Sequence, residues 1–217
     1  MTWLIIIGGF FVLLTLLTLK TSRSDGDLVG KLHPYRKVMM HIMPTRNESF
    51  VLYEDFVVAD ELLRYLEAVK GRLQCDMQHA IVAGVAHGLR KTPTMNRFVA
   101  GRRLYQRKGV WVTFSMKREK LNRAAKLTAV KREVGENESL KDLCDALNAT
   151  MKVERSDAVT YTDKEVGLFA KIPRPVMVVA VKIFQVLDYY NLLPASFIKN
   201  DGFYSSMFVA NLGSIGM

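Results

Sequence analysis

The longest apolar run in the chain covers residues 2–19, TWLIIIGGFFVLLTLLTL, and contains no charged residue. As a helix with a rise of about 1.5 Å per residue, it would be roughly 27 Å long, close to the hydrocarbon thickness of a bilayer. A cleavable signal peptide is the alternative, but no basic residue precedes the run and no small-x-small cleavage site precedes Lys20. The basic residues follow the run instead, and positively charged flanks favour the cytoplasmic side of a membrane. We therefore predict a single-pass membrane anchor at 2–19, with the C-terminal domain in the cytoplasm.

The pattern after this run predicts a tether and then a folded domain. Residues 20–30 are mostly small and polar and include glycine, so we predict a short tether. Residues 31–42 predict a short helix that begins near Pro34. Residues 49–58, SFVLYEDFVV, are rich in β-favouring side chains and predict a long strand. The domain is expected to cover residues 31–217.

The middle of the chain contains helical periodicity followed by strands. Asp60 is a candidate N-cap for a helix to about Leu73, and Asp76 for a nearly apolar, buried helix at 77–90. Two strands, 98–104 and 110–116, are predicted to form a hairpin-like pair that turns near residues 106–109.

The last third of the chain begins with an amphipathic helix at 139–153. Prolines flank a further amphipathic helix at 175–193, which we interpret either as lying along a membrane interface or as packed on the core. Alternation at 203–209 predicts a final strand, which lacks a following neighbour, so the sheet is expected to be cut or to be completed by something else. The whole order predicts an α/β (α+β) two-layer sandwich.

Cysteine and histidine usage indicates no metal site. Cys75 and Cys144 are far apart and in no ligand spacing, so we predict free thiols in a reducing compartment. The four histidines form no Cys/His cluster. His79 and His87 are eight residues apart and are interpreted as polar-edge residues of a packed helix.

The positive charge is concentrated in one stretch. The chain has a net charge of +10, whereas residues 90–132 alone contain fourteen basic residues and one acidic residue, a net charge of +13. Such a stretch would attract anionic lipid headgroups, the phosphates of coenzyme A, or nucleic acid. No aromatic-rich nucleic-acid motif accompanies it, so no nucleic acid is expected.

Two short motifs carry a family resemblance. Residues 208–216, FVANLGSIG, resemble the Asn-Leu-Gly strand of the 2-oxoacid dehydrogenase acyltransferase catalytic domain, whose superfamily includes chloramphenicol acetyltransferase. Pro93-Thr-Met-Asn96 is similar to a Pro-x-x-Asn motif that precedes a strand pair in that family. The resemblance implies acyl transfer from a coenzyme A thioester, and active sites formed between the subunits of a homotrimer. In that core the region before the Asn-Leu-Gly strand is short, so the helix at 175–193 resembles an addition.

The family's general base is missing from this chain. It is the histidine of a His-x-x-x-Asp-Gly motif downstream of the Asn-Leu-Gly strand, and acyl transfer needs such a base to accept the nucleophile's proton. The two segments that end in Asp-Gly have Thr21 and Phe197 at the histidine position, and Ser205 and Ser206 are given no role. We therefore assign no catalytic residue, no coenzyme A ligand and no metal ligand. The function expected is that of a membrane-anchored, acyltransferase-like protein truncated before its catalytic motif; the alternative is a non-catalytic membrane-associated interaction or scaffold module.

Overall fold

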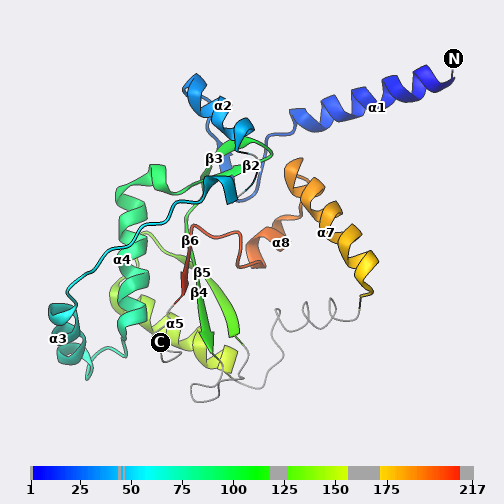
Figure 1. Ribbon diagram of the computed structural model, residues 1–217. Helices are drawn as coiled ribbons and strands as arrows, with labels where there is room; N and C mark the ends of the chain where they lie inside the picture. Colours follow the sequence, from blue (N-terminus) through cyan, green and yellow to red (C-terminus); the bar gives the residue numbers. More distant parts are fainter. Residues whose placement is uncertain (1, 44, 46, 118–126, 156–171, 211–217) are drawn as a thin grey trace. The chain divides into compact units, whose positions relative to one another are not determined.

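The chain is a mixed α/β protein whose computed structural model describes residues 2–43, 45, 47–117, 127–155 and 172–210 (Figure 1). It divides into two compact units, each built from three stretches of the chain. Unit 1 comprises residues 1–50, 97–108 and 172–199, and unit 2 comprises residues 51–96, 109–171 and 200–217. Each unit has one three-stranded sheet among the described residues.

The sheet of unit 1 has the order β1-β3-β2 and is antiparallel throughout. Its strands are β1 (Gly26–Leu28), β2 (Arg97–Ala100) and β3 (Arg103–Arg107). The predicted turn at 106–109 is wrong: β2 and β3 are joined by the two-residue turn Gly101-Arg102, with φ of 53° and 58°. Two residues with positive φ are what a tight hairpin matching the strand twist requires. A Cβ on Gly101 would also collide with the Tyr189 carbonyl oxygen.

The predicted tether at 20–30 needs correction, because this segment is part of the fold. β1 pairs with β3 so that Gly26 lies opposite Arg107 and Leu28 opposite Tyr105. Arg23, immediately before β1, is only 8% exposed. Residues 26–28 therefore form an edge strand of the sheet, and this segment is not a linker.

Four α-helices in unit 1 surround this sheet or extend from it: α1 (Thr2–Leu19), α2 (Pro34–Ile42), α7 (Arg174–Tyr189) and α8 (Ala195–Asn200). A short 3₁₀ turn, η1 (Asn47–Ser49), follows α2. The helix expected at 175–193 is present as α7 but ends earlier, because Asn191 has a left-handed φ of 57°. None of the α7 residues is buried, and Phe184 stacks against Phe197 at 4.6 Å between ring centroids.

The prediction of a single-pass membrane anchor is wrong. Among the residues that the structure describes, no helix is long and apolar enough to cross a membrane.

Unit 2 has a mixed sheet with the order β5-β4-β6. The central strand β4 (Val110–Lys117) pairs antiparallel with β5 (Leu127–Val134) and parallel with β6 (Met207–Ala210). The predicted strand pair 98–104 and 110–116 is therefore divided between two sheets. Among the described residues, the helices of unit 2 are α3 (Asp60–Val69), α4 (Met77–Lys91) and α5 (Leu140–Arg155), with the 3₁₀ turn η2 (Pro93–Met95) after α4.

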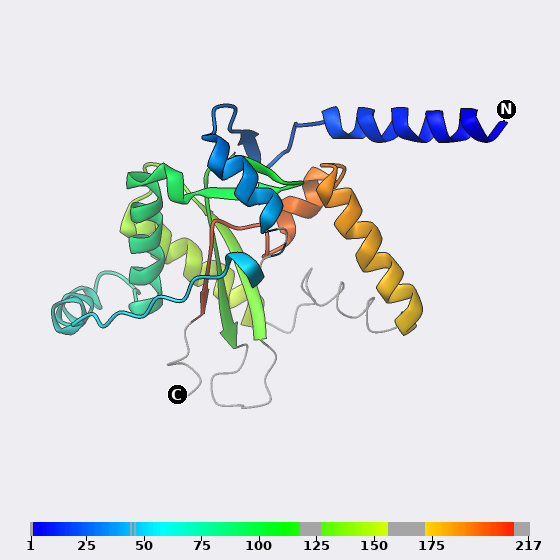
Figure 2. The same cartoon turned by 45° about the horizontal axis from the view of Figure 1, so that its top comes forward.

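The apolar core of unit 2 lies between this sheet and two helices (Figure 2). Val82, Ala86 and Leu89 of α4 and Leu143, Leu147 and Met151 of α5 pack against the β4 and β5 side chains. Spacings of four and three in α4 and of four in α5 put these residues on one face of each helix, as the periodicity predicted.

The predicted strand at 49–58 is wrong, since residues 50–58 lie in no helix or strand. Their side chains are exposed, with Val51 85% and Phe56 89% accessible. β-favouring residues form a strand only where a neighbouring backbone supplies hydrogen bonds, and none does so here among the described residues. The next helix, α3, is capped by Ala59 without a side-chain hydrogen bond, so Asp60 is its first residue and not its cap.

The prediction of two free thiols is also wrong. Cys75 and Cys144 form a disulfide, with their Cα atoms 5.7 Å apart and a sequence separation of 69. The bond joins the segment before α4 to α5, and Asn148 of α5 donates a hydrogen bond from Nδ2 to the Gln74 carbonyl at 2.6 Å beside it. Spacing along the chain carried no sign of this pairing, because only the packing of α4 on α5 brings the two residues together.

Candidate functional site

The described parts of both motif stretches are linked to strand β4 of unit 2 or to the residue before it. Asn96 follows η2, is buried, and donates a hydrogen bond from Nδ2 to the Gly109 carbonyl at 2.8 Å, just before β4 begins. From the second stretch, residues 208–210 pair in parallel with β4, Phe208 opposite Thr113 and Ala210 opposite Ser115. Residues 211–216 of this stretch lie outside the described residues. The structure thus places the described part of each motif against the same strand.

The segment that leads into β6 is fixed to β4 by hydrogen bonds. The Ser206 backbone N–H donates to the Trp111 carbonyl at 2.7 Å, and the Ser206 Oγ accepts from the Trp111 N–H at 3.0 Å. Thr113, which is fully buried, donates from Oγ1 to the Gly202 carbonyl at 2.8 Å. Ser205 Oγ donates to the Met207 carbonyl at 3.3 Å. The hydroxyl groups of both serines are therefore engaged with the backbone and show no arrangement of a nucleophile with a base.

His79 is part of a helix cap. Asp76 accepts a hydrogen bond from the His79 backbone N–H at 3.2 Å, and its carboxylate lies 2.6 Å from His79 Nδ1. The hydrogen bond to His79 lowers the pKa of Asp76 below its usual value. His79 is 2% exposed, and its Nε2 is buried without a hydrogen-bond partner among the described residues.

His87, on the same helix, is exposed. The two histidines therefore lie on different faces of α4, and the interpretation of both as polar-edge residues is wrong for the buried His79. A general base must reach the proton that it abstracts, which burial of His79 prevents in this conformation. Among the described residues, no group of three or more His, Cys, Asp or Glu side chains could hold a metal ion.

The described residues of the basic stretch at 90–132 belong to two separate compact units. Residues 118–126 lie outside the described residues. Many of its side chains have partners within their own unit: Arg90 with the Val134 and Gly135 carbonyls, Arg97 with Gln106, Arg103 with the Thr18 and Lys20 carbonyls, Arg107 with Asp25, Lys108 with Asp27, Lys131 with the Asp201 carbonyl, and Arg132 with Glu138. Arg102 has no hydrogen bond or ion pair within the described part of the chain.

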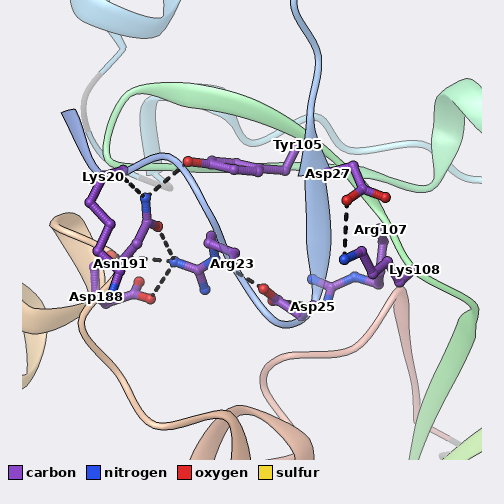
Figure 3. A network of polar contacts seen from close by, with 9 residues as sticks. All are labelled: Lys20, Arg23, Asp25, Asp27, Tyr105, Arg107, Lys108, Asp188 and Asn191. Carbon is purple, nitrogen blue, oxygen red and sulfur yellow. Dashed lines mark hydrogen bonds and ion pairs between the residues drawn. The ribbon is translucent and has the colours of Figure 1, made fainter. Parts of the chain in front are cut away.

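A buried polar network centred on Arg23 holds unit 1 together (Figure 3). Arg23 Nε donates to Asp25 Oδ1 at 3.0 Å, and its Nη1 donates to Asp188 Oδ1 at 2.9 Å and to Asn191 Oδ1 at 3.0 Å. The Asn191 Nδ2 in turn lies within hydrogen-bond distance of the Tyr105 hydroxyl and the Lys20 carbonyl. Tyr105 is completely buried. The network therefore joins the segment before β1 to β3 and to the C-terminal end of α7.

The charges of this network neutralise each other, which argues for a structural role. The hydrogen bonds and charges of Asp25 and Asp188 outweigh burial and raise the pKa of Arg23. Burial, with the nearby Arg23, lowers the pKa of Arg107, whose guanidinium stacks over Phe98 at 4.2 Å from the ring centroid. Sequence reasoning missed this network, because Asp188 is 165 residues away from Arg23 and no local pattern links them.

No family model, curated protein or solved structure matches this chain.

Proposed function

We propose that this chain is part of a coenzyme A-dependent acyltransferase-like protein, with a two-layer sandwich related to that core, and that the chain lacks its own general base. The observation that supports the proposal is the location of the two motif stretches. In the first stretch, Asn96 donates a hydrogen bond to the carbonyl of Gly109, the residue before β4. In the second stretch, residues 208–210 pair with β4 itself. Two short motifs more than a hundred residues apart in sequence thereby both connect to one strand or to the residue before it.

The chemistry requires a base that the described residues do not provide. Acyl transfer from a thioester proceeds when a nucleophile loses its proton to a base and attacks the carbonyl carbon. His79 is buried in a helix cap, and the exposed His87 has no hydrogen bond within the described residues that would orient it. The chain by itself should therefore bind a coenzyme A thioester without turning it over.

The test measures binding and turnover on the same preparation. Acetyl coenzyme A binding is followed by isothermal titration calorimetry, and thiol release with amine, hydroxyl and thiol acceptors is followed by a thiol reagent. We expect saturable binding and thiol release at the background rate. Absence of binding would refute the coenzyme A assignment. Turnover by the wild type would refute the claim that the chain lacks a general base if His79→Gln abolished it while the exposed control His87→Gln retained it.

A non-catalytic interaction module is the second candidate, and the exposed segment 50–58 favours it. Seven large apolar side chains in this segment are each more than two-thirds exposed: Phe50, Val51, Leu52, Tyr53, Phe56, Val57 and Val58. Exposed apolar groups of this number commonly mark protein contact sites. The homotrimer implied by the resemblance would be one such contact. Sedimentation velocity distinguishes the candidates: the module predicts assembly that Val51→Lys with Val57→Lys disrupts, without any coenzyme A binding.

A further inference from the structure

Unit 1 contains a pocket of about 400 Å³ next to the β2–β3 turn. Its walls come from the strand β1 and the residues after it, from α2, from the turn Gly101-Arg102 with the start of β3, and from Tyr189 at the end of α7. This volume falls within the range of small-molecule sites, about 300–1,000 Å³. The pocket belongs to unit 1, whereas the acyltransferase-like motif stretches lie beside β4 of unit 2, so it is a separate site from the one proposed above.

The charged residues that line this pocket are all basic. They are Lys37, Arg102 and Arg103, joined by His41, and no acidic residue is among the twelve that line it. The Arg103 guanidinium is occupied by the Lys20 and Thr18 carbonyls. Lys37 and Arg102 have no side-chain hydrogen bond or ion pair in the part of the chain that the structure describes. Two cations are thus available at one cavity, without a carboxylate in its lining to neutralise them.

The rest of the lining is mainly apolar and includes Leu28, Leu32, Met40 and Leu104. A second hollow of about 370 Å³ shares Met40, Gly101, Arg102 and Tyr189 with the first. Its carboxylate, Asp188, is already paired with Arg23 at 2.9 Å. A ligand that matches both kinds of lining has an anionic head and an apolar body. The head would then meet the cationic side chains, and the body would meet the apolar side chains.

The fold holds one side of the pocket in place and leaves the other side loosely packed. Arg102 is held at a φ of 58°, a conformation that costs a non-glycine residue energy, and Gly101 beside it contacts the Tyr189 carbonyl oxygen so closely that it has no room for a side chain. The Arg23 network fixes the end of α7 from which Tyr189 comes. By contrast, α2 has no buried residue, so it can adjust around a ligand at little cost in packing.

We propose that this pocket binds a small amphiphilic anion, which carries a carboxylate or phosphate head and an alkyl body of medium length. Lys37 and Arg102 contact the head with charge-assisted hydrogen bonds, and Met40, Leu28 and Leu104 contact the alkyl body. A carboxylate head and a phosphate head would make the same kind of contact, and the titration described next distinguishes them.

The test is calorimetric titration of the whole chain with octanoate and octyl phosphate below their micellar concentrations, with octanol and octylammonium as matched probes. We expect both anions to bind and both matched probes to bind at least tenfold more weakly. Whichever anion binds more tightly supports the site and identifies its head group. Octanol binding as tightly as octanoate would overturn the proposal.

Two variants remove the cations while preserving the backbone. Lys37→Gln changes an exposed helix residue, and Arg102→Asn keeps a side chain that tolerates positive φ. The double variant should lose at least tenfold in octanoate affinity, whereas the control Lys182→Gln, on α7 and outside the lining, should lose less than twofold. If the double variant and Lys182→Gln lose octanoate affinity to the same extent, the proposal is overturned.

A measurement on the unmodified chain is independent of these variants. The Met40 methyl resonance should shift on addition of octanoate, while that of Met151 in the core of unit 2 should not. An unmoved Met40 resonance at saturation would overturn the proposal.

Discussion

The two units are stabilised by different kinds of interior. Unit 2 has a cluster of eleven buried apolar residues from α4, α5, β4 and β5. Unit 1 has at its centre Arg23, Tyr105, Arg107 and Asn191, joined by hydrogen bonds, ion pairs and cation–π contacts. Apolar contacts are not directional and tolerate a change of shape, whereas a polar network leaves buried groups unpaired when one member is lost. The same kind of substitution should therefore have unequal effects in the two units.

The largest effect is expected from Arg23→Met, which keeps the length of the side chain and removes the charge. Asp188 would lose its ion-pair partner, and Asp25, with 10% of its side chain exposed, would keep only the longer contact of 3.4 Å to Arg107. Breaking a buried pair of this kind costs about 3–5 kcal/mol. Hydrogen exchange should show faster opening of β1 and β3. The matched change in unit 2 is Leu147→Met, expected to cost less than about 1.5 kcal/mol. Equal costs for the two variants would contradict the difference between the interiors.

Reduction of the Cys75–Cys144 disulfide is expected to have the next largest effect, and in unit 2 alone. The bond closes a long loop, with 69 residues of sequence separation, and a disulfide of this kind contributes about 2–4 kcal/mol by restricting the unfolded chain. Urea unfolding with and without a phosphine reductant measures it. Cys75→Ala with Cys144→Ala is the control and should be insensitive to reductant. A reductant effect on β3 of unit 1 that equals the effect on β4 would contradict this assignment.

The smallest effect is expected at the Asp76 cap of α4. Asp76→Ala removes the capping oxygen and should cost about 1 kcal/mol. Because the pKa of Asp76 is lowered in the folded protein, its ionised form contributes stability above its ordinary pKa of about 3.9. That contribution is lost as the pH falls through the lowered folded value. Asp76→Asn retains a capping oxygen without the charge, so thermal melts between pH 5 and pH 2 should show a smaller loss for this variant than for the wild type.

The sequence predicted those elements whose determinants are local. Helix α4 was predicted from the Asp76 cap and its apolar residues, and α5 from leucines spaced by three and four; both are confirmed. The strand predicted at 203–209 is confirmed in part, since β6 covers residues 207–210 and residues 203–206 lie outside it. The failures involve partners that are distant in sequence. The β-favouring residues at 50–58 have no strand beside them, and the polar residues before β1 are part of the fold only because Asp188 and Asn191 meet Arg23.

The candidate site shows the same division between local and distant information. The motif stretches were found in the sequence, but only the fold shows that Asn96 bonds to the residue before β4 and that β6 pairs with β4. The net charge of residues 90–132 was counted correctly, but the count contains no information about partners. Most of the described cations in that stretch contact carbonyl or carboxylate oxygens of their own unit. Arg102 is exposed and lies in a tight turn with positive φ, and the position of that turn depends on the register of β2 against β3.

The distance in sequence between Arg23 and its partners also has a consequence for biosynthesis. A ribosome adds roughly 5–20 residues per second, so the 165 residues that separate Arg23 from Asp188 take on the order of ten to thirty seconds to make. During that time Arg23 and Asp25 must remain hydrated, and β1 waits for β3 before it can pair. The segments of α4, β4, β5 and α5 are complete well before Asp188 is added. Unit 1 is therefore a late product of synthesis, although its first strand is among the first segments to be made.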